Sequence, residues 1–241
     1  MNLVIHGYGL IVGVAVWVAV EVAVRIGKRH KIDERAIWAA AMWAVVGGVV
    51  GARVYHVIDQ WSYYAQHLVE VGYLWQGGLG IWGAIIGGVV GVAIYYWVGA
   101  YCNTPVLELL DLGAIGLPLG QAIGRWGNYI NQELYGKPTT LPWGIQVNGI
   151  KYQPLFLYES LLMLMVFGGL WWLERRRLLP WGKGNYAAVY AISYGVVRFG
   201  LEGLRLDPWE WKGIPVARLM AVGFIMLGSV WLGRNLCLKK G

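Results

Sequence analysis

Seven long apolar segments constrain the fold of this chain more than any other feature of its sequence. They cover residues 8–26, 36–57, 78–98, 106–124, 155–173, 186–204 and 216–234. Each approaches the roughly 20 residues that a helix needs to cross the hydrocarbon core of a bilayer. Because lipid offers the backbone no hydrogen-bond partners, spanning segments of this length fold as helices. The sequence therefore predicts an all-α polytopic membrane protein with seven transmembrane helices.

The composition agrees with this fold class. Only 14% of the residues are charged, whereas soluble domains carry about 25%. Fifteen Trp and fifteen Tyr are enough to form aromatic belts at the two membrane interfaces. Thirty-six glycines suit the close helix packing found in membranes. We expect residues 1–241 to form a single transmembrane helical domain, with a longer outer segment at about 126–154.

Basic residues are distributed unequally between the two sets of connecting loops, and this predicts the orientation. The loop at 58–77 contains no lysine or arginine. On the same side of the membrane as this loop, the connection at 126–154 has Lys137 and Lys151, and that at 205–215 has Arg205 and Lys212. On the opposite side, the connection at 99–105 has none, but the first and last connections and the C-terminal tail are rich in basic residues, at Arg25, Lys28, Arg29, Lys31, Arg35, Arg175, Arg176, Arg177, Lys183, Arg234, Lys239 and Lys240. Such loops remain in the cytoplasm, so we expect an outer N-terminus and a cytoplasmic C-terminus. The net charge of +7 then reflects topology signals and anionic lipid rather than a nucleic-acid partner.

Charged side chains within or beside the apolar segments indicate a functional site. Each costs roughly 2.5–3.5 kcal/mol at the centre of a membrane helix, and helix association does not require them. In the predicted orientation they gather in the outer half of the bundle, at Arg53, Arg125, Arg198, Arg205, Glu133, Glu159 and Glu202. Arg198, Glu202 and Arg205 form one polar stripe at positions i, i+4 and i+7. A purely structural ion pair between Arg198 and Glu202 remains open.

The segment from Gly124 to Gly136 places an arginine, two asparagines and a glutamate at the end of the fourth apolar segment. A cation beside several amide donors suits an anionic lipid headgroup better than a metal. Gly77, Gly78 and Gly80, at the start of the third segment, could bring backbone N–H groups close to an anion. Asp111 lies deeper, where we expect a hydrogen bond that pins one helix to another. The sequence contains no HExxH pair and no Gly-x-Ser-x-Gly elbow, so we expect no metal and no cofactor.

These residues together resemble the prolipoprotein diacylglyceryl transferase family over nearly the whole chain. The most specific stretch is Gly-Arg-x-Gly-Asn-x-x-Asn-x-Glu within the block from Gly124 to Gly136. Further matches are Tyr8-Gly9, Gly51-Ala52-Arg53, Gly77-Gly78-Leu79, Asp111, Leu157-Tyr158-Glu159 and Arg198 with Glu202. The resemblance implies transfer of the diacylglyceryl group of phosphatidylglycerol to the lipobox cysteine of a prolipoprotein. It also implies a multi-pass protein of the bacterial cytoplasmic membrane, and leaves the oligomeric state undetermined.

The resemblance assigns residues to the site. Arg125 and Arg198 match the arginines that handle the phosphate, and Glu159 and Glu202 match acidic positions, so these four are expected to be catalytic. Substrate binding is expected at Tyr8, Arg53, Gly78, Asn128, Asn131, Glu133, Gly136 and Tyr158. Many members carry a histidine, proposed as the thiol base, where this chain has Trp82. The alternatives are a homologue that binds lipid or a partner protein without catalysis, and a membrane transporter.

Overall fold

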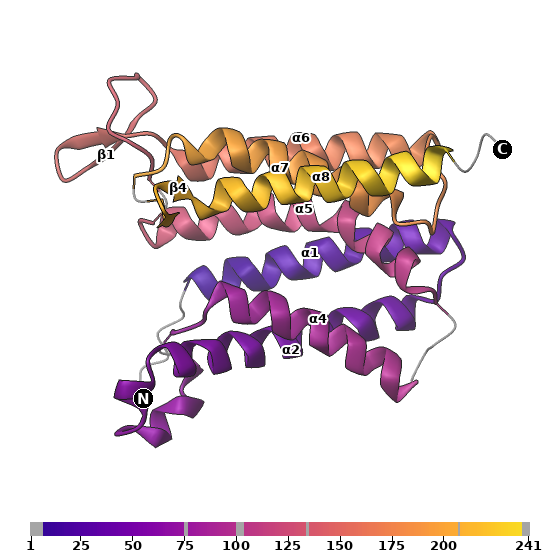
Figure 1. The fold of residues 1–241 in the computed structure, drawn as a ribbon, viewed down its shortest axis with the longest axis horizontal. Helices are drawn as coiled ribbons and strands as arrows, with labels where there is room; N and C mark the ends of the chain where they lie inside the picture. The colour runs from indigo at the N-terminus through magenta and orange to yellow at the C-terminus, as the bar shows by residue number, and fades with distance from the viewer. Residues whose placement is uncertain (1–6, 75–76, 100–103, 134, 207, 238–241) are drawn as a thin grey trace. The chain divides into compact units, whose positions relative to one another are not determined.

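The computed structural model describes residues 7–74, 77–99, 104–133, 135–206 and 208–237, and a long helix lies over each of the seven apolar segments (Figure 1). The prediction of seven helices is confirmed at the level of secondary structure. They are α1 (Gly7–Arg29), α2 (Glu34–Asp59), α4 (Ile81–Val98), α5 (Val106–Ile130), α6 (Leu155–Arg175), α7 (Asn185–Glu202) and α8 (Val216–Cys237). Shorter elements connect them: α3 (Trp61–Tyr64), η1 (Leu68–Gly72), and two hairpins formed by β1 (Ile145–Val147) with β2 (Ile150–Tyr152) and β3 (Glu210–Trp211) with β4 (Ile214–Pro215).

The protein is a mostly helical polytopic membrane protein. Within the described ranges, six helices are long and apolar enough to cross a bilayer, namely every long helix except α7. α7 has 18 residues, among them Arg198, Glu202, Asn185 and three tyrosines, and is the least apolar of the long helices. α5 runs on to Ile130, so the first five residues of the segment expected outside, 126–154, are helical. The number of crossings and the orientation of the termini stay predictions.

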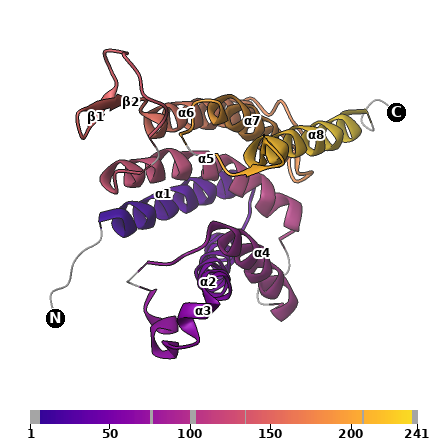
Figure 2. The same ribbon diagram turned by 60° about the vertical axis from the view of Figure 1, so that its left-hand side comes forward.

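The chain divides into two compact units, one formed by Met1–Ile26 with Pro105–Gly241 and the other by Gly27–Thr104. In the first unit, α1 runs antiparallel to α5, with Gly116 against the carbonyl of Ala19 and Gly127 against the ring of Tyr8. α6 and α7 lie along α5, and α8 packs against α7 (Figures 1 and 2). The absence of a side chain at these glycines lets the backbones approach closely, which is how helices associate without a hydrophobic driving force.

Asp111 joins α5 to the beginning of α7. Its fully buried carboxylate accepts four backbone hydrogen bonds, from the N–H groups of Gly182, Gly184, Tyr186 and Ala187 at 2.9–3.1 Å. The first N–H groups of a helix have no partner within the helix, and its N-terminus favours a negative charge. Gly184, the residue before α7, offers no side-chain cap, so Asp111 supplies the cap from another helix. The predicted pinning hydrogen bond is confirmed.

The second unit is organised around the antiparallel pair α2 and α4. Gly47 and Gly51 of α2 face Gly83, Gly87 and Gly91 of α4, and a methyl group at any of these five would overlap a backbone carbonyl of the other helix. Gly88, on the neighbouring face of α4, has its closest such contact at 3.4 Å, an ordinary van der Waals distance. The pair therefore depends on a stripe of small residues on one face of each helix.

We expect Gly87→Ala to lower the thermal stability of the purified protein, because the added methyl overlaps the carbonyl of Gly47. Separating the two backbones should cost about 1–3 kcal/mol, as overpacking does elsewhere. Gly88→Ala is the matched control, since it adds the same methyl one residue away with only ordinary contacts. Melting curves in detergent test this, and equal melting temperatures for both variants would contradict the role of the stripe.

We expect Asp111→Ala to destabilise the protein by at least about 2 kcal/mol, because it leaves several buried backbone N–H groups without an acceptor. Asp111→Asn should lie between this variant and the unaltered protein, since the amide keeps one acceptor oxygen but turns a donor toward the helix end. Chemical or thermal unfolding provides the measurement. Unchanged stability in Asp111→Ala would show that α7 does not depend on this cap.

Candidate functional site

One end of the first unit gathers the ends of several helices. Because α5 and α7 run parallel while α1, α6 and α8 run the other way, the ends of α5 and α7 lie beside the starts of the other three. Asp111 and Arg125 are 14 residues apart on α5, which corresponds to roughly 20 Å along a helix. The cap at Asp111 and the charges around Arg125 therefore lie at opposite ends of the unit.

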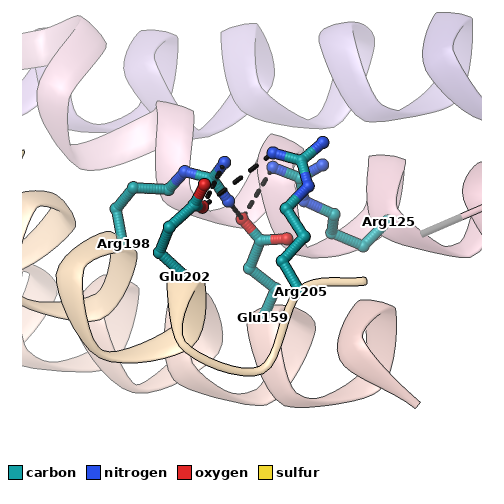
Figure 3. Close-up of polar contacts among 5 residues, drawn as sticks. All are labelled: Arg125, Glu159, Arg198, Glu202 and Arg205. Carbon is teal, nitrogen blue, oxygen red and sulfur yellow. Dashed lines mark hydrogen bonds and ion pairs between the residues drawn. The ribbon is translucent and has the colours of Figure 1, made fainter. Parts of the chain in front are cut away.

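Three arginines and two glutamates form an ion-pair network at this end, which we call the arginine–glutamate cluster: Arg125, Glu159, Arg198, Glu202 and Arg205 (Figure 3). Glu159 Oε1 lies 2.9 Å from Arg125 Nη2 and 4.0 Å from Arg198 Nη1. Glu202 Oε2 lies 2.9 Å from Arg198 Nη2 and 3.9 Å from Arg205 Nη1. Arg198 thus links the two carboxylates. The predicted convergence is confirmed for these five of the seven charges, and Arg53 and Glu133 are not part of the network.

The two carboxylates are deeply buried while the arginines remain partly accessible. The side chains of Glu159 and Glu202 are 3% and 1% exposed, against 25%, 15% and 34% for Arg125, Arg198 and Arg205. Charges in such surroundings interact more strongly than in water, so the carboxylates orient the guanidinium groups above them. Three positive and two negative groups leave one net positive charge. The cluster therefore favours a ligand with a single negative charge.

The carboxylates of the cluster retain unused hydrogen-bonding capacity. Among the described residues, Glu159 Oε2 and both oxygens of Glu202 have no hydrogen-bond donor, although Glu202 Oε2 lies close to Arg198. A buried charged acceptor without a donor costs more than an ordinary missing hydrogen bond. Such atoms are unusual in native proteins and point to a functional reason.

Gly136 places the last arginine of the cluster. Gly136 and Lys137 lie beside the turn that follows α7, where Gly136 forms a β-bridge with Arg205 and Lys137 N–H donates to Leu204 O at 2.8 Å. A Cβ at Gly136 would come within 2.8 Å of Gln153, Leu155 and Leu204 at once. Glycine is therefore needed for this crossing of three segments. A direct contact of Gly136 with substrate stays a prediction.

The signature block is partly helical and partly a turn. Asn128 is buried in the last turn of α5, and its carbonyl accepts a hydrogen bond from Glu133 N–H at 2.8 Å. Asn131 caps the helix, and its Nδ2 donates to Glu133 Oε1 at 3.1 Å. Gln132 between them has φ +56°. Asn131 and Glu133 thus pair with each other on the exposed turn rather than with the arginine–glutamate cluster.

Tyr8 and Tyr158 border the cluster in different ways. Tyr8 packs on Gly127, where a Cβ would lie 2.8 Å from the tyrosine ring. The Tyr158 hydroxyl donates to Gln153 Oε1 at 3.1 Å and accepts from Trp143 Nε1 at 2.7 Å. Tyr158 therefore ties the β1–β2 hairpin to the start of α6. Sequence reasoning missed Trp143 and Gln153, because no local pattern connects them to Tyr158.

Arg53 and Gly78 belong to the second unit. Arg53, 6% exposed, donates to the carbonyl groups of Val71 and Gly77 at 2.8 Å, of Gly78 at 3.2 Å, and of Glu70. Its guanidinium also lies 5.2 Å from the ring centre of Tyr64. Gly78 has φ +71°, and a Cβ there would strike Arg53 and His56. The Arg53 side chain thus holds the backbone of the loop before α4. Substrate contacts of Arg53 and Gly78 stay predictions.

Comparison with known proteins places the chain in a family. A model of the prolipoprotein diacylglyceryl transferase family matches residues 1–233. The chain belongs to this family. It is 39% identical to a phosphatidylglycerol–prolipoprotein diacylglyceryl transferase of Finegoldia magna, over 92% of this chain and 88% of that protein. It is 38% identical to the protein of the same name from Thermosynechococcus vestitus, over 94% of this chain and 87% of the relative.

Membership in the prolipoprotein diacylglyceryl transferase family agrees with the resemblance deduced from the motifs. The match runs through every segment that contributes to the arginine–glutamate cluster, since all five residues lie between positions 125 and 205. The sequence match therefore establishes the family without any use of the geometry of the cluster. The roles of individual residues in this chain stay predictions.

We expect Arg53→Lys to weaken the loop at Glu70, Val71, Gly77 and Gly78, because an ammonium group cannot reproduce a planar fork that reaches four carbonyl groups. Hydrogen exchange should become faster in η1 and around Gly77, and the melting temperature should fall. Arg198→Lys is the comparison variant and should leave that loop unchanged. If Arg53→Lys instead weakens lipid binding without affecting exchange, Arg53 is a headgroup ligand rather than a loop anchor.

Proposed function

We propose that this protein is a phosphatidylglycerol–prolipoprotein diacylglyceryl transferase that acts on the lipobox cysteine of prolipoproteins. The observation that carries the proposal is the arginine–glutamate cluster, with one net positive charge among apolar helices. Family membership and the names of the relatives support the same activity. A lipid phosphodiester carries one negative charge, which complements that of the cluster.

The reaction exchanges one bond for another at a glycerol carbon. The cysteine sulfur forms a C–S bond with the diacylglyceryl group as the carbon–oxygen bond to phosphate breaks. The electron pair of that bond goes to the phosphate oxygen, glycerol phosphate leaves as a dianion, and the proton of the thiol passes to water. Negative charge grows on the leaving phosphate, where charge-assisted hydrogen bonds from arginine are strongest. We assign this stabilisation to Arg125 and Arg198, which contact the buried carboxylates.

The same cations favour the attacking thiolate. A cysteine thiol has a pKa near 8.5, and neighbouring positive groups lower it. Glu159 and Glu202 hold the arginines in place and keep their guanidinium planes oriented. This mechanism needs no histidine, which accords with Trp82 at the position where many family members have one.

The membrane arrangement completes the proposal. We infer seven crossings in the bacterial cytoplasmic membrane, with the N-terminus outside and the C-terminus in the cytoplasm. The basic loop residues support this orientation. Secreted prolipoproteins would then meet the arginine–glutamate cluster at the outer leaflet.

We expect Arg125→Ala and Arg198→Ala each to reduce turnover by at least about a hundredfold, as the loss of one transition-state donor does in other enzymes. Arg→Lys at either position should also fail, since a point charge cannot form the bidentate contact. The assay follows the mass increase of a lipobox peptide incubated with purified protein and phosphatidylglycerol.

Arg176→Ala is the matched control, because it removes an exposed arginine at the end of α6 and should retain full activity. Circular dichroism checks that all variants are folded. Near-normal turnover in Arg125→Ala or Arg198→Ala would overturn the phosphate assignment. An inert unaltered protein would favour the homologue without catalysis, and movement of a solute across vesicles without peptide modification would favour a transporter.

A further inference from the structure

We infer that Glu159 and Glu202 recognise the hydroxyl groups of the lipid headgroup, so that the site selects an anionic phospholipid whose headgroup carries hydroxyl donors. This inference rests on the proposed function and deepens it, because it assigns a specificity role to carboxylates that otherwise only orient arginines. Carboxylate oxygens of the arginine–glutamate cluster that have no hydrogen-bond donor are the basis for this role.

The two carboxylates have more acceptor sites than the cluster fills. In the described part of the chain, Glu159 Oε2 and Glu202 Oε1 have no donor, and the two residues are only 2% and 3% exposed. A carboxylate has about four lone-pair sites. Carboxylates are not required to hold an arginine in place, since the hydrogen bonds that Arg53 donates in the other unit all go to backbone carbonyl groups. The spare acceptors at the cluster are therefore suited to donors that come with the ligand.

Binding of a phosphate makes these acceptors more available. The arginines are more exposed than the carboxylates that they contact, so the guanidinium groups lie between the carboxylates and the surface. A phosphate draws guanidinium N–H groups toward itself and away from Glu159 and Glu202. The carboxylates then need replacement donors, because an unpaired buried charge is costly. A headgroup hydroxyl, separated from the phosphate ester oxygen by two or three carbon atoms, can supply them.

The charge of the cluster decides between kinds of headgroup. An ammonium group would also satisfy a carboxylate, but it would lie beside three guanidinium groups and repel them. A zwitterionic lipid would also leave the net positive charge of the cluster uncompensated. A headgroup carboxylate would meet Glu159 and Glu202 with like charge. Neutral hydroxyl groups are repelled neither by the arginines nor by the glutamates. The single negative charge of such a lipid compensates the net positive charge of the cluster.

The experiment compares two lipids with identical acyl chains, phosphatidylglycerol and phosphatidylpropanol. Both have a three-carbon headgroup, one phosphodiester and one negative charge, and only the first has headgroup hydroxyls. We expect kcat/KM to be at least about tenfold higher for phosphatidylglycerol, as for the loss of a hydrogen bond to a charged group. Phosphatidylethanolamine should be a poorer substrate than either.

The variants Glu159→Gln and Glu202→Gln test which groups read the hydroxyls. Both are expected to lose activity, but the ratio of kcat/KM for the two lipids should fall toward one, and this ratio is independent of the fraction of folded enzyme. Ser160→Ala is the matched control. It removes a buried hydroxyl next to Glu159 that donates to Ala122 O at 2.9 Å, and its ratio should equal that of the unaltered protein. For a variant too slow to assay, displacement of a fluorescent phosphatidylglycerol by each lipid supplies the same ratio.

The outcomes separate this inference from the proposed function. If the unaltered protein turns over both lipids with equal kcat/KM, hydroxyl recognition is overturned while the transferase activity stands. If the tenfold preference persists in both glutamine variants, other groups read the headgroup and the assignment to Glu159 and Glu202 is overturned. If the unaltered protein modifies no peptide with phosphatidylglycerol, the proposed function itself fails.

Discussion

The pairing of two buried carboxylates with three arginines is the interaction on which the site depends. Long arginine side chains lose considerable conformational entropy when they are held in one place. Glu159 and Glu202 supply the opposing charge, and their burial strengthens it. The guanidinium groups are thereby oriented before any ligand arrives, which is the preorganisation that makes electrostatic catalysis effective. Breaking either pair would leave a buried charge uncompensated.

The helices bring these charges together only because they are fastened at both ends of the first unit. Asp111 caps α7 about 20 Å from Arg125 on α5, so the register of the two helices is set away from the chemistry. At the other end, Gly136 admits three segments to one crossing and positions Arg205. A polar residue with a structural role and a glycine with a steric one thus help to determine where the charges of the arginine–glutamate cluster lie.

Arg53 illustrates how the same residue type serves a different purpose. Its guanidinium is surrounded by backbone carbonyls, whereas those of Arg125 and Arg198 face carboxylates. Carbonyl dipoles stabilise the Arg53 cation and occupy its N–H groups. Arg125 and Arg198 share carboxylates, and their guanidinium groups remain partly accessible. The position of an arginine in an apolar helix does not tell a loop anchor such as Arg53 from a member of the cluster such as Arg125. The difference lies in the acceptors, which are carbonyl groups for Arg53 and a carboxylate for Arg125.

The sequence alone determined the helical membrane fold, the positions of the seven long helices and the family, because apolar length and a specific motif are local properties of a chain. It also identified Asp111 as a link between helices and Arg198 with Glu202 as one polar face, since spacing within a helix predicts which residues share a side. Tertiary structure decided that Glu159 is shared by Arg125 and Arg198, that Arg53 binds carbonyls, and that Tyr158 holds a hairpin. These contacts join residues from different segments, and no local spacing encodes such pairings.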